Sequence, residues 1–183
     1  MTSRFNIVSA PVDIKIPPPR LVIYGQPKVG KTSFASNAPD PLLIQTEDGA
    51  AGLRIPKIPE TPCETWEELM DCLRAVLKQD HDRKTLIIDT LDKAEQLAQA
   101  HVLKRDFNGN HEKYMGYYKG PILAGEMISE VLSALDHIRK KKGMNIVLIA
   151  HDGLQAGANA LGDDFKKWAP NISKYAWNRV RDW

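Results

Sequence analysis

Cysteine is scarce in this chain, with only two residues among 183. Cys63 and Cys72 form no Cys-x-x-Cys pair, and the five histidines show no spacing typical of metal ligands. These absences argue against a disulfide framework and against a zinc site. Both thiols are therefore predicted to be reduced and partly buried.

Long apolar runs are also missing. No stretch approaches the roughly 20 residues needed to cross a bilayer, and Met1–Ala10 lacks the apolar core of a signal peptide. The formal net charge is only +2, which is too small to indicate a polyanionic partner by itself. With 43% hydrophobic residues, the chain is expected to be one cytoplasmic domain with a real core and no membrane contact.

The segment Gly25–Thr32 reads Gly-Gln-Pro-Lys-Val-Gly-Lys-Thr and follows the apolar run Leu21–Tyr24. It matches the phosphate-binding pattern G-x-x-x-x-G-K-[ST], in which glycines allow backbone conformations closed to other residues and N–H groups surround a phosphate. Lys31 supplies positive charge for the β- and γ-phosphates, and the Thr32 hydroxyl suits Mg²⁺. A strand before the loop and a short helix over 31–38 after it distinguish the motif from a chance glycine turn.

We therefore predict ATP and Mg²⁺ as cofactors. The predicted nucleotide-binding residues are Gly25, Gln26, Pro27, Lys28, Val29, Gly30, Lys31, Thr32 and Ser33.

Short apolar runs alternate with helical patterns along the chain. Strands are expected at Leu21–Tyr24, Pro41–Thr46, Thr85–Asp89 and Asn145–Ala150. Helices are expected at Thr65–Gln79, which opens with a capping box, and at Leu91–Phe107, Pro121–Lys142 and Ile172–Trp183. This alternation predicts an α/β fold with a mostly parallel sheet flanked by helices, and a ligand site beyond the carboxyl ends of the strands.

Three other segments are expected to be irregular. Before Pro17-Pro18-Pro19 the chain is expected to be extended, with a short strand at Val12–Ile16. Asn108–Gly120 is rich in Gly, Asn and Tyr, and His151–Gly162 is rich in Gly and Ala, so both are expected to be loops.

Polar residues at three strand ends are candidates for chemistry. Asp89 ends an apolar strand, where it could order Mg²⁺ or cap the next helix, and these roles are compatible. Glu47 could orient and deprotonate a water, with Asp48 as its neighbouring competitor, although Glu47-Asp48-Gly49 could also be an ordinary turn. His151 could donate to the γ-phosphate and report nucleotide state, or it could be structural. The predicted catalytic residues are Lys31, Glu47 and His151, and the predicted metal ligands are Thr32 and Asp89.

Two segments combine aromatic and basic residues, as proteins that bind single strands do. The predicted nucleic-acid contacts are Lys113, Tyr114, Tyr117, Tyr118 and Lys119 in the first segment, and Lys166 and Lys167 in the second. Either segment could instead be a lid or a subunit contact.

Four segments together resemble the RecA-like ATPase core, and they occur in the order of that family: Gly25–Thr32, Gln45–Gly49, Leu86–Thr90 and Val147–His151. The resemblance runs from about Arg20 to the end of the chain. More closely, the chain is similar to phage-encoded RecA-like ATP-binding proteins that act in single-strand annealing and recombination.

The resemblance implies that Glu47 is the catalytic base and that His151 senses the γ-phosphate. It also implies that the fourth strand lies between the phosphate-loop strand and the Asp89 strand. DNA-binding loops are implied at Asn108–Gly120 and Asp152–Pro170. The implied partners are single-stranded DNA, further copies of the chain and a single-strand-binding protein, in the cytoplasm of a host cell.

The chain departs from RecA proper in two ways. RecA has a glutamine-type sensor at the position of His151, and it has terminal parts for filament formation that this sequence does not show. The resemblance also implies further strands beyond Trp183. Residues 1–20 are thus expected to be an extended segment, and residues 21–183 a RecA-like ATPase core that is either minimal or without its last strands.

The leading prediction is a DNA-stimulated, Mg²⁺-dependent ATPase that binds single-stranded DNA and promotes annealing or recombination. One alternative is a small-molecule or nucleotide kinase, but His151–Pro170 contains no arginine of the kind that such lids usually carry. The other alternative is a non-hydrolysing ATP-binding regulator or helicase loader, in which Glu47 would be dispensable.

Overall fold

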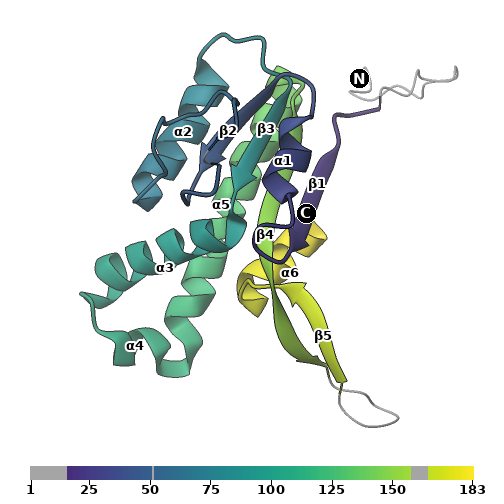
Figure 1. Cartoon of the computed structure of the whole chain (residues 1–183). Coiled ribbons are helices and arrows are strands. Elements are labelled where there is room, and N and C mark those ends of the chain that lie inside the picture. The colour runs from purple at the N-terminus through teal and green to yellow at the C-terminus, as the bar shows by residue number, and fades with distance from the viewer. Residues whose placement is uncertain (1–15, 51, 158–164) are drawn as a thin grey trace, which may run out of the picture.

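The computed structural model describes residues 16–50, 52–157 and 165–183. Figure 1 shows a central sheet with helices packed along it. In chain order the elements are β1 (Arg20–Gly25), α1 (Lys31–Ser36), β2 (Pro41–Gln45), α2 (Trp66–Lys78), β3 (Thr85–Asp89), α3 (Leu91–Phe107), α4 (His111–Met115), η1 (Gly116–Tyr118), α5 (Lys119–Lys142), β4 (Asn145–Gly157), β5 (Phe165–Pro170) and α6 (Lys174–Asp182). The strand expected at Val12–Ile16 lies outside the described residues, except for Ile16, which is not in a strand.

The main sheet has the parallel order β1-β4-β3-β2, and β5 pairs antiparallel with the far part of β4. The predicted α/β fold with a mostly parallel sheet is therefore confirmed, and β4 lies between β1 and β3 as the RecA resemblance implies. The register places Gly25 beside His151 and Gln45 beside Asp89. The carboxyl ends of the strands thus meet at one edge, where the loops that leave them can share a site.

Both faces of the sheet are buried at β2, β3 and the first part of β4, whereas the edge strand β1 is partly exposed. Leu86 and Ile88 of β3 join a large apolar cluster with residues of α2, α3, α5 and α6. Ile87 points to the opposite face, where a smaller cluster includes Ala35 of α1. Burial on both faces explains why the strands β2, β3 and the first part of β4 are continuous apolar runs instead of alternating patterns.

The start of α2 follows the capping signal in part. The Thr65 hydroxyl accepts a hydrogen bond from the Glu68 N–H at 3.2 Å, as a helix N-cap should. The Glu68 carboxylate accepts from the Glu64 N–H at 2.8 Å, one residue before the position that a capping box requires. The predicted helix is present. Its capping box is half formed, because the Glu68 carboxylate accepts from the Glu64 N–H in place of the Thr65 N–H.

The loop expected at Asn108–Gly120 is instead mostly helical, which corrects the prediction. Asn110 caps α4 by accepting from the Lys113 N–H at 2.9 Å. Tyr114 packs edge-on against Phe107, with ring centroids 5.6 Å apart. A capping residue and a buried ring thus stabilise a short helix in a segment whose composition favours a loop.

The prediction of a loop at His151–Gly162 is also wrong for the first half of this segment. β4 continues to Gly157 and pairs with β5 in a register that runs from Asp152 opposite Pro170 to Gly157 opposite Phe165. Backbone hydrogen bonds support this hairpin without β-branched side chains, so the composition gave no strand signal. Residues 158–164 lie outside the description. None of the described helices combines the length and apolar character needed to cross a membrane.

Candidate active site

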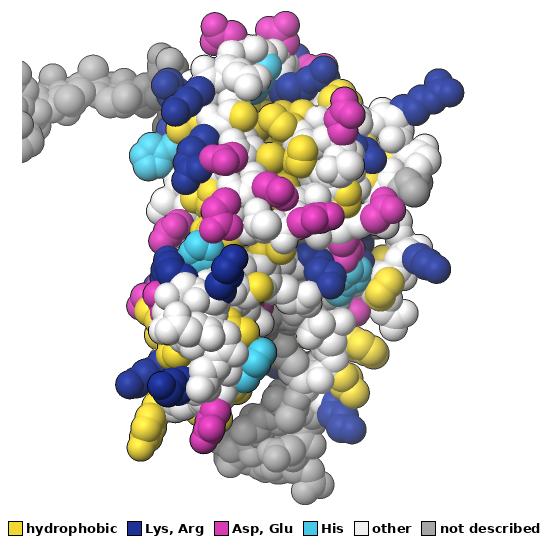
Figure 2. Space-filling model, turned by 90° about the vertical axis from the view of Figure 1, so that its left-hand side faces the viewer, with side chains coloured by type: hydrophobic (Ala, Val, Ile, Leu, Met, Phe, Trp, Pro, Cys, Tyr) yellow, Lys and Arg dark blue, Asp and Glu magenta, His cyan; other side chains and the backbone are white. Residues whose placement is uncertain are grey.

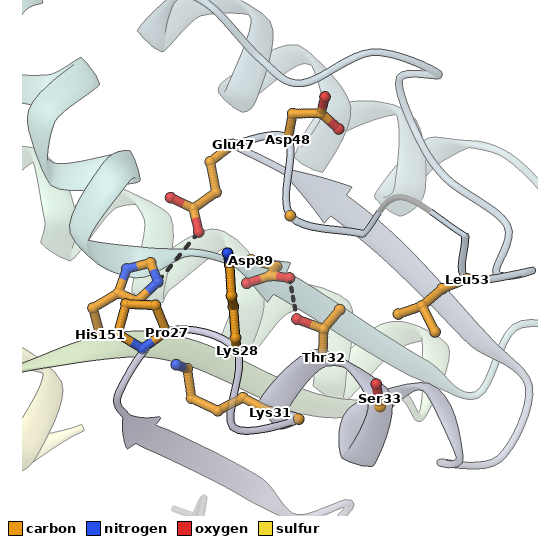
Figure 3. Close-up of a pocket in the computed structure, with 12 residues that line it drawn as sticks. Pro27, Lys28, Lys31, Thr32, Ser33, Glu47, Asp48, Leu53, Asp89 and His151 are labelled. Atoms are coloured by element: carbon orange, nitrogen blue, oxygen red, sulfur yellow. Dashed lines mark hydrogen bonds and ion pairs between the residues drawn. The ribbon is translucent and has the colours of Figure 1, made fainter.

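The phosphate loop joins β1 to α1 and lines a pocket of about 410 Å³ at the carboxyl ends of the strands (Figure 3). Lys31 is only 8% exposed, and its Nζ donates to the carbonyl oxygens of Gly25 and Gln26, both at 2.7 Å. Hydrogen bonds from an ammonium to charged oxygens are stronger than those to carbonyls. Lys31 can therefore exchange these acceptors for phosphate oxygens. The predicted nucleotide-binding residues that line the pocket are Pro27, Lys28, Gly30, Lys31, Thr32 and Ser33.

The loop has two residues in the left-handed region, and one of them is a glycine of the motif. Gly30 has φ 94°, which only glycine adopts easily, and the neighbouring Lys28 has φ 65°. Gly25 does not have a positive φ, and a Cβ added there would meet Val29 at an ordinary contact distance of 3.6 Å. A glycine-only conformation is thus required at Gly30 but not at Gly25.

Thr32 and Asp89, the two predicted metal ligands, lie in direct contact. The Thr32 hydroxyl donates to Asp89 Oδ2 at 2.7 Å, and Asp89 is 3% exposed (Figure 3). Burial raises the pKa of the Asp89 carboxyl, against the opposing effects of the Thr32 hydrogen bond and the charges of His151 and Lys31. A hydroxyl and a carboxylate are hard oxygen donors of the kind that Mg²⁺ prefers, so this donor pair fits that ion.

Replacing Asp89 with Asn is expected to stabilise the ligand-free protein. Because the pKa of Asp89 is raised, the folded protein binds this proton more tightly than the unfolded chain does, and stability falls as pH rises through the raised pKa. The ionised carboxylate therefore costs stability at neutral pH, and the neutral amide removes that cost. We expect calorimetry to show a thermal midpoint higher by a few degrees.

The same D89N variant is expected to lose most of its Mg²⁺-dependent gain in ATP affinity. Titration calorimetry with and without the metal should show that this gain has fallen about tenfold or more. Asp80→Asn, a change at a fully exposed carboxylate, is the control for charge alone. A lower midpoint together with an undiminished effect of Mg²⁺ would contradict the assignment of Asp89.

Glu47 reaches the pocket because the ends of β2 and β3 are tied together. The Thr46 N–H donates to the Asp89 carbonyl at 2.8 Å, and the Thr46 hydroxyl donates to the Thr90 carbonyl at 2.7 Å and accepts from the Thr90 N–H at 2.8 Å. Thr46 is buried and was not singled out from sequence, although its place directly before Glu47 was visible. These bonds fix the start of the segment that carries Glu47.

The Glu47 side chain points toward His151, whereas Asp48 is exposed and points away from it (Figure 3). Glu47 Oε1 lies 3.5 Å from His151 Nε2. Burial raises the pKa of the Glu47 carboxyl; the charge of His151 opposes this, and the charges of Asp92 and Asp89 add to it. A carboxylate with a raised pKa is a stronger base, which suits a group that must take a proton from water.

His151 is held from its other side by Asp92, a residue that the sequence reading did not identify. Asp92 Oδ1 accepts from the His151 backbone N–H at 2.9 Å, and Asp92 Oδ2 lies 3.0 Å from His151 Nδ1. Asp92 belongs to the first turn of α3 and is 5% exposed. The only feature of the sequence that pointed to Asp92 is its position as a carboxylate three residues after Asp89. Glu47, His151 and Asp92 thus form one chain of polar contacts.

A family model described as "AAA domain" matches residues 17–183. The chain belongs to the AAA domain family. A search of curated proteins found no match to the chain.

Membership of the AAA domain family makes the chain a P-loop ATPase domain, a class that uses a nucleotide and usually Mg²⁺. The residues present fit both ligands. Lys31 offers a cation to phosphate, and Thr32 and Asp89 offer oxygen ligands to the metal.

The predicted nucleic-acid contacts have mixed outcomes. Tyr114 is 7% exposed and buries its ring against Phe107, so it is not available to stack on a base, which corrects that prediction. The other predicted contacts are exposed: Lys113, Tyr117, Tyr118, Lys119, Lys166 and Lys167. Whether any of these residues touches nucleic acid stays a prediction.

Proposed function

We propose that this AAA-family chain is a Mg²⁺-dependent ATPase of the RecA-like class that binds single-stranded DNA and promotes annealing or recombination in phage DNA metabolism. The observation that carries the ATPase part is the convergence of Lys31, Thr32–Asp89 and Glu47–His151 on one pocket (Figure 3). The sheet order, with β4 between β1 and β3, supports the RecA-like class.

In the proposed reaction Lys31 binds the β- and γ-phosphates and balances the charge that develops as the γ-phosphoryl group leaves. Thr32 and Asp89 would hold Mg²⁺, which would neutralise phosphate charge when bound. Glu47 orients a water in line with the γ-phosphorus and accepts its proton. His151, 3.5 Å from Glu47, lies where it can respond to the γ-phosphate.

The proposed DNA surface lies at the end of the molecule toward which β4 runs. Figure 1 shows α4 and the β4–β5 hairpin at this end, on either side of the molecule. Tyr117 is 92% exposed and Tyr118 is 55% exposed. Both have φ in the left-handed region, at 50° and 56°, which bulky residues rarely adopt. Exposed rings held by a strained backbone support a binding role for this turn.

The hairpin contributes a second part of this surface. Leu154 pairs with Trp168, and both are more than half exposed. Because side chains alternate along a strand, Lys166 shares the face of Trp168, whereas Lys167 points to the other face. A cation beside an exposed ring is the combination that holds a phosphate while a base stacks. Trp168 and Lys166 therefore join the proposed surface more readily than Lys167.

α6 adds a cation to the turn that carries Tyr117 and Tyr118, which we call the tyrosine turn. Lys174 Nζ lies 5.6 Å from the Tyr118 ring centroid and 5.0 Å from that of Tyr175, and the two ring centroids are 6.4 Å apart. Lys174 and Tyr175 were not predicted from sequence, because only the fold brings α6 next to η1.

Figure 2 shows the face formed by α2, α3 and α4, which carries both acidic and basic side chains. Acidic side chains gather across its middle, and exposed acids at α2 and just before it include Glu60, Glu64, Glu67, Glu68 and Asp71. DNA is therefore expected to follow the tyrosine turn and the hairpin instead of the acidic surface at α2. Further copies of the chain and a single-strand-binding protein remain proposed partners.

Replacing Tyr117 and Tyr118 together with Ala is expected to weaken binding of a fluorescent oligo-dT about tenfold or more in anisotropy titrations. Each stacked base contributes about 1–3 kcal/mol. Phe34→Ala is the control, because Phe34 is also an exposed ring, at 68%, and belongs to α1, which packs through Ala35 on the opposite side of the sheet. Equal weakening by both variants would contradict the proposed surface.

Activity assays separate the proposed function from its alternatives. Stimulation of ATP turnover by oligo-dT supports the ATPase, and phosphate transfer to an added acceptor supports a kinase. ATP binding without turnover, with or without DNA, supports the non-hydrolysing regulator.

A further inference from the structure

We propose that Asp92 is a positioning residue that fixes the tautomer of His151, and so determines which ring nitrogen faces Glu47 and the pocket. This proposal rests on the proposed function for its effect on hydrolysis, but the tautomer itself does not depend on that function. No part of the sequence reading or of the family match assigns a role to Asp92.

The carboxylate of Asp92 can only accept hydrogen bonds, and two nitrogen atoms of His151 lie within hydrogen-bond distance of it. The His151 backbone N–H donates to Oδ1 at 2.9 Å, and the His151 ring places Nδ1 3.0 Å from Oδ2. An acceptor at that distance requires that Nδ1 carry a proton. The neutral tautomer with its proton on Nε2 would instead put the Nδ1 lone pair against the carboxylate.

Position and burial make this arrangement rigid. Asp92 lies in the first turn of the 17-residue helix α3, where the helix dipole favours a negative side chain, and it is 5% exposed. The backbone contact to His151 prevents the carboxylate from turning away. The two bonds therefore hold both the ring orientation and the main chain at the point where β4 leaves the sheet.

The tautomer determines whether His151 Nε2, the ring nitrogen that faces Glu47, can accept a proton. With Nδ1 protonated, Nε2 can either accept a proton or, when protonated, form an ion pair with Glu47 Oε1, which lies 3.5 Å away. A proton can then pass between His151 and the Glu47 side of the pocket. In the other tautomer Nε2 is a neutral donor that cannot accept, so the pair loses this exchange.

The isosteric change Asp92→Asn tests the idea sharply. An amide has one acceptor oxygen and one donor NH₂. If its oxygen stays on the His151 backbone N–H, its NH₂ faces Nδ1, which must then be unprotonated. We expect D92N to move the ring proton from Nδ1 to Nε2.

Nitrogen-15 spectra of the histidine-labelled full chain measure this directly, with His151→Gln used only to assign the signal. The wild-type ring is expected to carry a proton on Nδ1, whether neutral or cationic, and D92N is expected to show the neutral Nε2–H form. Glu95→Gln is the matched control, since Glu95 is also buried on α3 but accepts from the Ser173 N–H at 2.9 Å. E95Q is expected to leave the His151 spectrum unchanged.

Kinetics then test the positioning role. D92N is expected to lower kcat for MgATP about 10- to 100-fold while KM changes less than about threefold, because the phosphate loop is untouched. A wild-type Nε2–H tautomer overturns the proposal even if D92N does not fold. An unchanged tautomer in folded D92N, or a switched tautomer with unchanged kcat, also overturns it. If the wild-type protein binds ATP but never hydrolyses it, the ATPase proposal fails while the tautomer result stands.

Discussion

Replacing Lys31 with Ala is expected to lower ATP turnover about 100-fold or more while leaving the fold intact. The Lys31 ammonium is one of two cations, with that of Lys28, that the phosphate loop presents at the pocket, and phosphoryl transfer depends mainly on positioning and on stabilising charge. Among the described residues, the side chain donates to the carbonyl oxygens of Gly25 and Gln26 in its own loop, so few tertiary contacts are lost. Steady-state phosphate release measures turnover, and circular dichroism with a thermal scan checks the fold.

Two comparisons make the Lys31 result specific. Lys140→Ala removes an exposed lysine from the end of α5, outside the pocket, and is expected to keep the parental rate. Lys31→Arg keeps the charge but replaces a compact ammonium with a planar fork, and is expected to be nearly as inactive as the alanine variant. Parental turnover by folded K31A would remove the basis for placing ATP in this pocket.

Replacing Glu47 with Gln is expected to lower kcat about 10²- to 10⁴-fold, the usual contribution of a general base. The amide keeps the shape of the side chain but cannot take a proton from water. MgATP should still bind with similar affinity, because Lys31, Thr32 and Asp89 are unchanged. Single-turnover hydrolysis with radiolabelled ATP measures the chemical step, and titration calorimetry measures binding.

Asp48→Asn is the natural comparison for Glu47→Gln. Asp48 is the neighbouring carboxylate, but it is exposed and points away from His151 (Figure 3). A larger loss in D48N than in E47Q would assign the base to Asp48. Equal, high turnover in both variants would mean that neither carboxylate acts as the base.

Much of the fold could be predicted because its signals are local. Continuous apolar runs bounded by polar residues marked β1, β2 and β3, and the capping signal at Thr65 marked the start of α2. The predictions failed where stability comes from partners distant in sequence or from the backbone. α4 depends on the ring of Tyr114 packing against Phe107, and the β4–β5 hairpin depends on main-chain pairing.

The residues of the candidate site also divide into those with a local signal, which were predicted, and those without one, which were missed. Lys31, Thr32, Asp89, Glu47 and His151 were predicted because each directly follows an apolar strand or belongs to a known loop motif, and all five line one pocket. Asp92, Lys174 and Tyr175 were missed because each lies inside a helix whose polar residues have no distinctive spacing. Their significance depends on which neighbour the fold brings to them.

By itself, the sequence determined the kind of chemistry: a phosphate loop with its lysine and hydroxyl, and acidic residues at the ends of buried strands. Only the tertiary structure decided that Asp92 holds His151, 59 positions away, and that His151 faces Glu47. The physical reason is that hydrophobic periodicity fixes which residues form a strand or a helix, whereas strand order and register fix which strand ends become neighbours.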